Sequence, residues 1–284
     1  MWRRFSPTRW AIRSAFAEIQ SSGGVGPARH DRCVTYREQA TAVPGVVLWQ
    51  RTTDGRTRIL PDGCLDLIWD GRQLFVAGPD SAARWHDCAR GISYVALRFH
   101  YGVGPALLRV PADELSDRSV RLHELLPATA ARRLAEQVAD RPVEALTGWL
   151  TRRAAEQTVD PLGRRVHAMA SAATPVALMA DRLGMSARQL HRRCLPLFGY
   201  GPRRLAGILR LRRALDLART GVPLAAVAAR CGYADEAHLC RDALALGRGT
   251  PAVLRREKRE EVDGVAVGIA DDGIPHSPEG IPRL

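Results

Sequence analysis

Hydrophobic and polar positions follow two different periods along this chain. Between about residues 37 and 99, short runs of β-branched and aromatic residues are separated by turn signals such as Asp54-Gly55 and Pro61-Asp62-Gly63. Runs of this length between turns predict short strands. The expected strands are residues 46–49, 57–60, 65–69, 74–77 and 94–99. The first part of the chain is therefore predicted to form a small antiparallel sandwich or barrel.

After residue 105 the apolar positions recur at the three- and four-residue intervals of helices. Helices are expected at residues 105–110, 127–139 and 142–156, and they connect the β-rich part to the rest. From about residue 160 to residue 256 the pattern is helical throughout and includes an internal repeat. The pattern predicts an α+β protein with a β-rich head, a helical connector and an all-α C-terminal domain.

The repeat relates two segments about 48 residues apart. Its matched positions are Pro175 with Pro223, Met179 with Val227, Ala180 with Ala228, Arg182 with Arg230 and Gly184 with Gly232, then, at an offset of 49, Leu190 with Leu239 and Arg192 with Arg241. Two copies are too few for a solenoid, so we expect two similar units joined by a connecting helix.

Each copy predicts a helix, a tight turn and a second helix. In the first copy Thr174 is placed to cap a helix that starts at Pro175, Gly184 ends that helix, and Ser186 caps the next one. The side chains expected on the inward face of that second helix are Leu190, Cys194 and Leu197.

The second copy repeats this order. Pro223 starts its first helix, Gly232 ends it, and Asp235 caps a helix with Leu239 on its inward face. Two helices joined by a glycine turn are the arrangement of a helix-turn-helix unit. A plain helical bundle with solvated arginine faces is the alternative reading of the same pattern.

The charge of the chain is concentrated in this repeat region. The formal net charge is +12, and the segment from Arg164 to Arg256 has 17 arginines against five acidic residues, which accounts for the whole excess. A local basic excess of this size is typical of a surface that meets phosphates. Anionic membranes and acidic proteins are alternative partners, and a non-specific nucleic-acid binder would share the same charge.

Composition and motifs exclude several other classes. The chain has 284 residues with 46% hydrophobic and 25% charged residues, typical of a globular protein, and no apolar run reaches the roughly 18 residues of a membrane helix. The six cysteines form no C-x-x-C pair, which is typical of reduced thiols in a cytoplasmic protein. Residues 1–20 lack the apolar core of a secretory signal.

No catalytic or metal-binding motif stands out, so no enzyme, metal or cofactor is predicted. The alternative is a cupin-like enzyme with a DNA-binding appendage, in which Asp62, Asp66 and His86 would form a hydrolytic or metal site. That alternative predicts turnover or bound metal independent of residues 160–256.

The repeat region also resembles a known family. Residues 179–256 include "MADRLGMSARQLHRRC", "GPRRLAGILRLRRALDLARTG" and "AAVAARCGYADEAHLCRD", and they resemble the AraC/XylS-type DNA-binding domain. Its most specific part here is the pattern GY-x-D-x-x-HL-x-R at residues 232–241. The segments "ILPDGCLDLIWDG", "VAGPDSAARW" and "RFHYGVGPALLRVPADELSD" resemble the sensor-like head of some regulators in this family.

The resemblance implies a transcription regulator that inserts two recognition helices, at about residues 186–197 and 235–246, into successive major grooves. Matching by position gives base-reading candidates Arg188, His191, Arg192, Ala237, His238, Arg241 and Asp242, and phosphate candidates Arg193, Arg203, Arg204 and Arg213. Because Asp235, Glu236 and Asp242 make the second helix less basic, we expect the first unit to dominate affinity.

A transcription regulator usually responds to an effector, and we expect the β-rich head to be the domain that binds it. The polar candidates for an effector pocket near the apolar strands are Asp62, Asp66, His86, Arg98 and His100. Turn capping by Asp62 and a solvated strand face for Arg98 and His100 are the structural alternatives. The expected partner is double-stranded DNA at a promoter or operator. RNA polymerase, a small-molecule effector and a second copy of the chain are further candidates.

The predicted domain boundaries follow from these patterns. They are an N-terminal arm at 1–36, a sensor-like head at 37–120, a helical connector at 121–159, the double helix-turn-helix domain at 160–257 and a tail at 258–284. The arm and the tail are expected to be disordered because neither has the periodicity of a folded segment.

Overall fold

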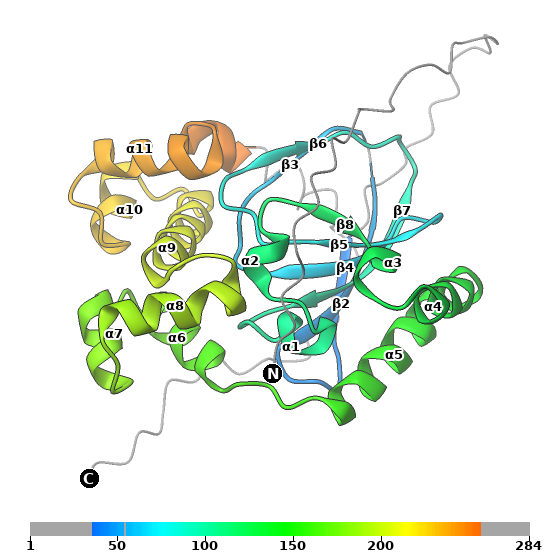
Figure 1. Ribbon diagram of the computed structural model, residues 1–284. Helices are drawn as coiled ribbons and strands as arrows, with labels where there is room; N and C mark the ends of the chain where they lie inside the picture. The colour runs from blue at the N-terminus through cyan, green and yellow to red at the C-terminus, as the bar shows by residue number, and fades with distance from the viewer. Residues whose placement is uncertain (1–35, 54, 257–284) are drawn as a thin grey trace, which may run out of the picture. The chain divides into compact units, whose positions relative to one another are not determined.

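The computed structural model describes residues 36–53 and 55–256 (Figure 1). The predicted arm up to residue 35 and the predicted tail from residue 258 lie outside this part of the chain. In the described part, a sheet lies between two groups of helices, with α6 to α11 on one side of it and α4 and α5 on the other (Figure 1).

In residues 36–53 and 55–256, eight strands form two antiparallel sheets. They are β1 (Tyr36–Ala40), β2 (Val46–Thr52), β3 (Thr57–Ile59), β4 (Leu65–Trp69), β5 (Leu74–Ala77), β6 (Arg84–His86), β7 (Ser93–Phe99) and β8 (Ser119–Arg121). The main sheet has the order β1-β2-β7-β4-β5-β8, and β3 pairs with β6 in a separate ribbon. Among the described residues, the edge strands β1 and β8 do not pair with each other. The predicted barrel therefore does not form, and the head has an open sheet instead.

The two faces of the main sheet differ in what they bury. Register places Leu48, Leu97, Leu67 and Val76 side by side on one face, and each is at most 1% exposed. This row belongs to the main core of the head. The opposite face has a smaller cluster around Trp49 and the polar side chains described below. Alternation along each strand therefore separates an apolar face from a mixed one.

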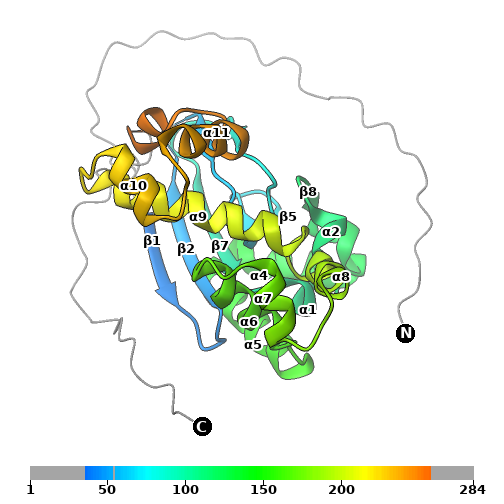
Figure 2. The same ribbon diagram turned by 90° about the vertical axis from the view of Figure 1, so that its left-hand side faces the viewer.

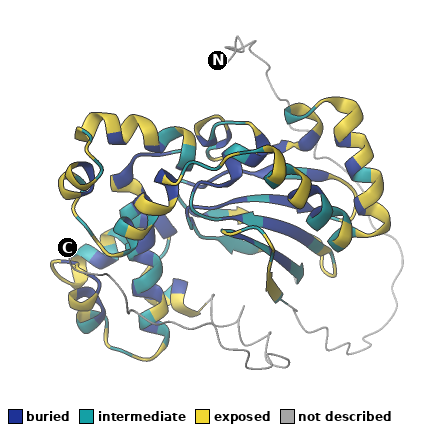
Figure 3. Ribbon diagram, turned by 90° about the horizontal axis from the view of Figure 1, so that it is seen from below, coloured by how far each residue is buried: buried dark blue, intermediate teal, exposed yellow. Residues whose placement is uncertain are grey.

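Helices cover the apolar face. Three short helices, α1 (Gly104–Leu108), α2 (Ala112–Leu115) and α3 (Leu122–Leu125), precede the longer α4 (Ala128–Asp140) and α5 (Pro142–Glu156). Leu134 and Val138 of α4 and Leu146 and Leu150 of α5 are buried in the same core as the strands. The two predicted connector helices therefore cover the head. Their outer faces are exposed (Figure 3).

Within the described residues, the C-terminal domain has six helices that pack around one core, followed by a helical segment at residues 251–256. They are α6 (Leu162–Ser171), α7 (Val176–Arg182), α8 (Ala187–Phe198), α9 (Pro202–Arg219), α10 (Leu224–Arg230) and α11 (Glu236–Gly247). Helix α9 lies between the pair α7–α8 and the pair α10–α11 (Figure 2). It buries side chains on several sides, including Leu205, Ile208 and Leu215, so both pairs share a single core.

One expected detail was wrong by a residue. Thr174 does not cap α7; Pro175 occupies that position, and the helix begins at Val176. On α8 the expected inward residues Leu190 and Cys194 are buried and Leu197 packs half-buried against the same core, and Phe198, 1% exposed, is a further inward residue. No helix among the described residues is long and apolar enough to cross a bilayer.

Candidate nucleic-acid interface

The two helix-turn-helix units have turns with the same hydrogen bonds. Gly184 and Gly232 have φ of +64° and +75°, a conformation that side chains disfavour, while the space around each would admit a Cβ. Each glycine amide donates to the carbonyl three residues earlier, at 2.9 and 3.3 Å, and the next amide donates to the carbonyl five residues earlier, at 2.9 Å in both. The 48-residue repeat is therefore a repeat in structure.

The expected caps of the two recognition helices are confirmed. The Gln189 amide donates to Ser186 Oγ at 3.2 Å, and Gln189 Oε1 accepts from the Ser186 amide at 2.8 Å. In the second unit the His238 amide donates to Asp235 Oδ1 at 2.6 Å. These bonds satisfy amides that have no partner inside the helix, so both helices begin at a defined residue.

Three arginines project from the recognition helices. Arg188 and Arg192 of α8 lie four residues apart and therefore on one face, opposite the buried Leu190. Arg241 occupies the position on α11 that matches Arg192. All three are exposed and make no ion pair or hydrogen bond with another described residue. These guanidinium groups are accessible to an external acceptor.

The two candidate histidines are braced by neighbouring groups. The His191 ring packs on Gly201, where a Cβ would come within 2.3 Å of the ring. The His238 ring lies edge-on to Tyr233 at 5.1 Å, and its Nδ1 accepts from the Ala234 amide at 3.4 Å. His191 and Ala237 are exposed, whereas His238 is half-buried.

Asp242 forms an ion pair inside the domain. Its Oδ2 lies 2.6 Å from Arg210 Nη2 on α9, and the Arg210 guanidinium covers the Tyr233 ring at 4.3 Å. Burial alone would lower the pKa of Arg210, but the hydrogen bond and charge of Asp242 outweigh it and raise that pKa. Burial also raises the pKa of Tyr233 to about 12. Asp242 therefore anchors α11 to α9.

Three of the four phosphate candidates have partners within the protein. Arg193 pairs with Asp160 at 2.7 Å, and Arg213 donates to the Ser171 carbonyl. Arg204 donates to the Ser81 carbonyl of the head at 2.6 and 3.1 Å. Only Arg203 of this set is exposed without a partner among the described residues.

Four of the five effector candidates come together on the mixed face of the sheet. Arg98 Nε lies 3.0 Å from Asp66 Oδ1 and 3.7 Å from Asp62 Oδ2. The Trp49 indole Nε1 also donates to Asp66 Oδ1, at 2.9 Å. His100 Nδ1 is 3.2 Å from Cys64 Sγ nearby. His86 lies apart on β6, where its Nε2 is 3.3 Å from the Tyr94 hydroxyl.

This polar cluster is satisfied by groups of the protein itself. Arg212 of α9 lies 3.6 Å from Asp62, so the cluster joins the head to the C-terminal domain. Burial would raise the pKa of Asp62, but the charges of Arg98 and Arg212 hold that pKa below its ordinary value. The gap beside Cys64 and Phe99 has no room for a water molecule. The cluster therefore forms a junction between the head and the C-terminal domain.

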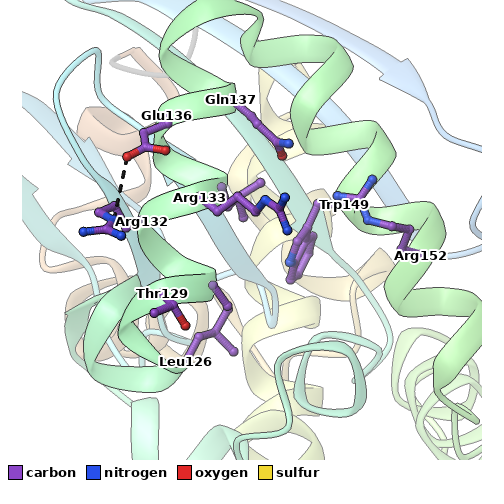
Figure 4. Close-up of a pocket in the computed structure, with 10 residues that line it drawn as sticks. Leu126, Thr129, Arg132, Arg133, Glu136, Gln137, Trp149 and Arg152 are labelled. Atoms are coloured by element: carbon purple, nitrogen blue, oxygen red, sulfur yellow. Dashed lines mark ion pairs between the residues drawn. The ribbon is translucent and has the colours of Figure 1, made fainter.

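A larger hollow of about 560 Å³ lies elsewhere, between α4 and α5 (Figure 4). Arg133 and Arg152 lie on either side of Trp149, and Arg132 pairs with Glu136 at 3.7 Å. The polar side chains that line it are all exposed. Among the described residues, no group of three or more His, Cys, Asp or Glu side chains could hold a metal ion.

One histidine near the junction predicts a pH dependence of stability. Burial, with His100 and Arg212 nearby, lowers the pKa of His167 from 6.5 to about 4. Between pH 6.5 and about 4, this histidine binds more protons in the unfolded chain than in the folded one. The free energy of unfolding therefore decreases as the pH falls from 6.5 toward 4. We expect His167→Gln to flatten that decrease in urea unfolding measured from pH 7 to 4. An equally steep decrease in the variant would contradict this assignment.

Two parts of the chain match models of protein families. Residues 179–257 match the model of a helix-turn-helix domain, and residues 45–121 match that of a domain of unknown function, DUF6597. Solved structures of ToxT from Vibrio cholerae O395 and of unsaturated fatty acid bound ToxT from strain SCE256 are similar, each at 9% identity. They cover 78% and 76% of this chain and 98% and 97% of theirs, with TM-scores of 0.42 and 0.41. A comparison with curated protein sequences finds no significant match.

Two glycine-turn units with capped recognition helices, bridged by α9, define a DNA-binding protein of the double helix-turn-helix class. The matched domain is of the AraC type, as the sequence pattern predicted. The chain is a DNA-binding transcription regulator with an AraC-type helix-turn-helix domain at residues 179–257 and a DUF6597 domain at residues 45–121.

Proposed function

We propose that this regulator reads a specific operator by placing α8 and α11 in successive major grooves on one side of the duplex. The observation that carries the proposal is the pair of equally built recognition helices, each with an exposed arginine at the matching position, Arg192 and Arg241. A helix of this kind fits the major groove, where base edges differ in their hydrogen-bonding pattern.

The proposed base readers are the exposed arginines of α8 and α11 that have no partner among the described residues. Arg188, Arg192 and Arg241 can each bridge O6 and N7 of a guanine. Ala237, exposed at the start of α11, offers a methyl group that suits a thymine methyl. We do not assign base reading to Asp242, because its carboxylate is held by Arg210.

The two units are proposed to contribute unequally. Helix α8 begins with no acidic residue and presents two outward arginines, whereas α11 begins at Asp235 and Glu236. A carboxylate near the phosphates of the duplex weakens binding through like-charge repulsion. The first unit therefore supplies more of the affinity, and the second adds sequence preference at the other half-element.

The proposal is tested by selecting from a randomised duplex library with the full chain at two salt concentrations. Non-specific binding falls steeply with salt, while specific contacts partly persist. We expect a motif of two half-elements about one helical turn apart. Recovery of no motif at either concentration would favour a non-specific nucleic-acid binder instead.

Two adjacent arginines on α9 give a matched test of phosphate contact. Arg203 is exposed and has no partner in the described part of the chain, whereas Arg204 is held by the Ser81 carbonyl. We expect Arg203→Ala to reduce the slope of log affinity against log salt by about 0.9, because one counterion fewer is released. Arg204→Ala should leave the slope unchanged. The salt dependence of binding to the selected operator measures both, and equal slopes in the two variants would contradict the distinction.

A further inference from the structure

The carbonyl ends of both recognition helices contact the head. At the end of α8, the Gly199 carbonyl accepts from Ser116 Oγ at 3.1 Å. At the end of α11, the Leu246 carbonyl accepts from the Ala83 amide at 2.6 Å. The last carbonyls of a helix have no partner within it, so these two head groups satisfy acceptors that the helices leave open.

Arg58 makes a second contact with the end of α11. Its Nη1 donates to the carbonyls of Gly247 and Arg248, each at 3.0 Å. Register pairs Arg58 with Trp85 across the β3–β6 ribbon, and the guanidinium lies 4.5 Å from the centre of that ring. The stacking fixes the direction of the side chain, so Arg58 behaves as a rigid donor to the helix end.

The head segments that make these contacts are tied to one another. The Ser81 amide donates to Asp117 Oδ1 at 2.7 Å, and the Asp117 amide donates to the Pro79 carbonyl at 3.2 Å. Ser81 also accepts from Arg204 at the start of α9. We call Arg58, residues 79–83 and residues 116–118 the brace. The brace reaches α8, α9 and α11 at once.

We propose that the brace sets the separation of the two recognition helices and thereby determines which half-element spacing the protein accepts. This inference rests on the proposed function. Arg58 and Asp117 are positioning residues in it: neither is assigned to DNA, and each acts through the helix ends that the brace holds.

The physical reason lies in the geometry of the duplex. Successive major grooves on one side recur every 34–36 Å, or about 10–10.5 base pairs. One inserted base pair shifts a half-element by about 3.4 Å and turns it by about a tenth of a turn. A rigid pair of helices rejects such a change, whereas a loosely held α11 can follow it at the cost of affinity for the best spacing.

The first test compares two arginines that stack on the same tryptophan. The Arg56 guanidinium lies 4.6 Å from the centre of the Trp85 ring and pairs with Asp87 at 3.1 Å. Unlike Arg58, it donates no hydrogen bond to the described residues of α11. We expect Arg58→Met to lower affinity for the best spacing about five- to tenfold and to reduce discrimination against one inserted base pair. Arg56→Met should keep the wild-type profile. The measurement is affinity of the full chain for operators with spacers of −1, 0, +1 and +2 base pairs.

The second test uses Asp117 and needs no DNA. Asp117→Ala removes the acceptor for the Ser81 amide, whereas Asp117→Asn keeps one and tolerates the φ of +57° at this position. Hydrogen exchange of the Ala83 amide, which is bonded to Leu246, reports whether the brace still holds α11. We expect at least tenfold faster exchange in Asp117→Ala and Arg58→Met, and near wild-type exchange in Asp117→Asn and Arg56→Met.

The outcomes separate the inference from the proposed function. Absence of sequence-specific binding in the wild type overturns the proposed function and the inference together. Specific wild-type binding with the same spacing profile in Arg58→Met and Asp117→Ala overturns the inference alone. A flattened profile in those two variants, with unchanged unfolding temperature and rescue by Asp117→Asn, supports it.

Discussion

The double variant in which alanine replaces both Arg188 and Arg192 is expected to bind the selected operator more weakly, with a loss of about 2–6 kcal/mol in binding free energy. One good arginine–guanine pair contributes about 1–3 kcal/mol, and both side chains project from the same face of α8. Both are exposed and have no partner among the described residues, so the fold should be unaffected. Titration of labelled operator, with the unfolding temperature as a check, measures the effect.

The single variant Arg188→Ala separates base reading from phosphate contact. If Arg188 reads a guanine, the loss is confined to operators with that base and disappears when the base pair is already changed. A phosphate contact would instead weaken binding to every sequence alike and reduce the salt slope. An equal loss on matched and mismatched operators would therefore refute the base-reading role of Arg188.

The largest expected effect on stability comes from Leu190→Ala. Leu190 is 0% exposed in the core that α8 shares with α9. Removing a buried leucine side chain costs about 2–5 kcal/mol, because transfer free energy is lost and a cavity remains. The total free energy of unfolding of a natural domain is only about 5–15 kcal/mol. We expect a large drop in the free energy of unfolding, measured by urea denaturation.

Leu244 provides the matched control on the second recognition helix. It is 53% exposed, and the same truncation to alanine should change the free energy of unfolding by no more than about 0.5 kcal/mol. Similar losses for Leu190→Ala and Leu244→Ala would mean that the packing of α8 described above is wrong.

Sequence reasoning predicted the elements whose signals are local. Strands β4 and β5 have the expected bounds because turn residues such as Asp70-Gly71 flank them, and helix α5 has them because its apolar residues recur at helical intervals. β6 and β8 are three residues long, and β1 is mostly exposed, so none of them has a strong pattern. Alternation also indicates which face a strand buries, but not whether the edge strands meet, and the barrel prediction failed for that reason.

In the candidate interface, too, features with local sequence signals could be predicted, and contacts between residues far apart in the sequence could not. The glycine turns and the caps at Ser186 and Asp235 depend on neighbours within five residues, and they could be predicted. The partners of Arg204 and Arg58 could not, because Ser81 and Gly247 lie 123 and 189 residues away in the sequence. Asp242 was predicted as a base reader because nothing local indicates that Arg210, 32 residues earlier, holds it.

The single core around α9 has a consequence for how such a regulator acquires new targets. Residues that stabilise the two units, such as Leu190 and Leu239, are buried in that shared core, whereas Arg188, Arg192 and Arg241 lie outside it. Under the proposed function, outward positions on one helix can therefore change while the other helix keeps the protein attached to its site. A new operator is then reachable in two successive steps, one half-element at a time, without passing through an unfolded or unbound intermediate.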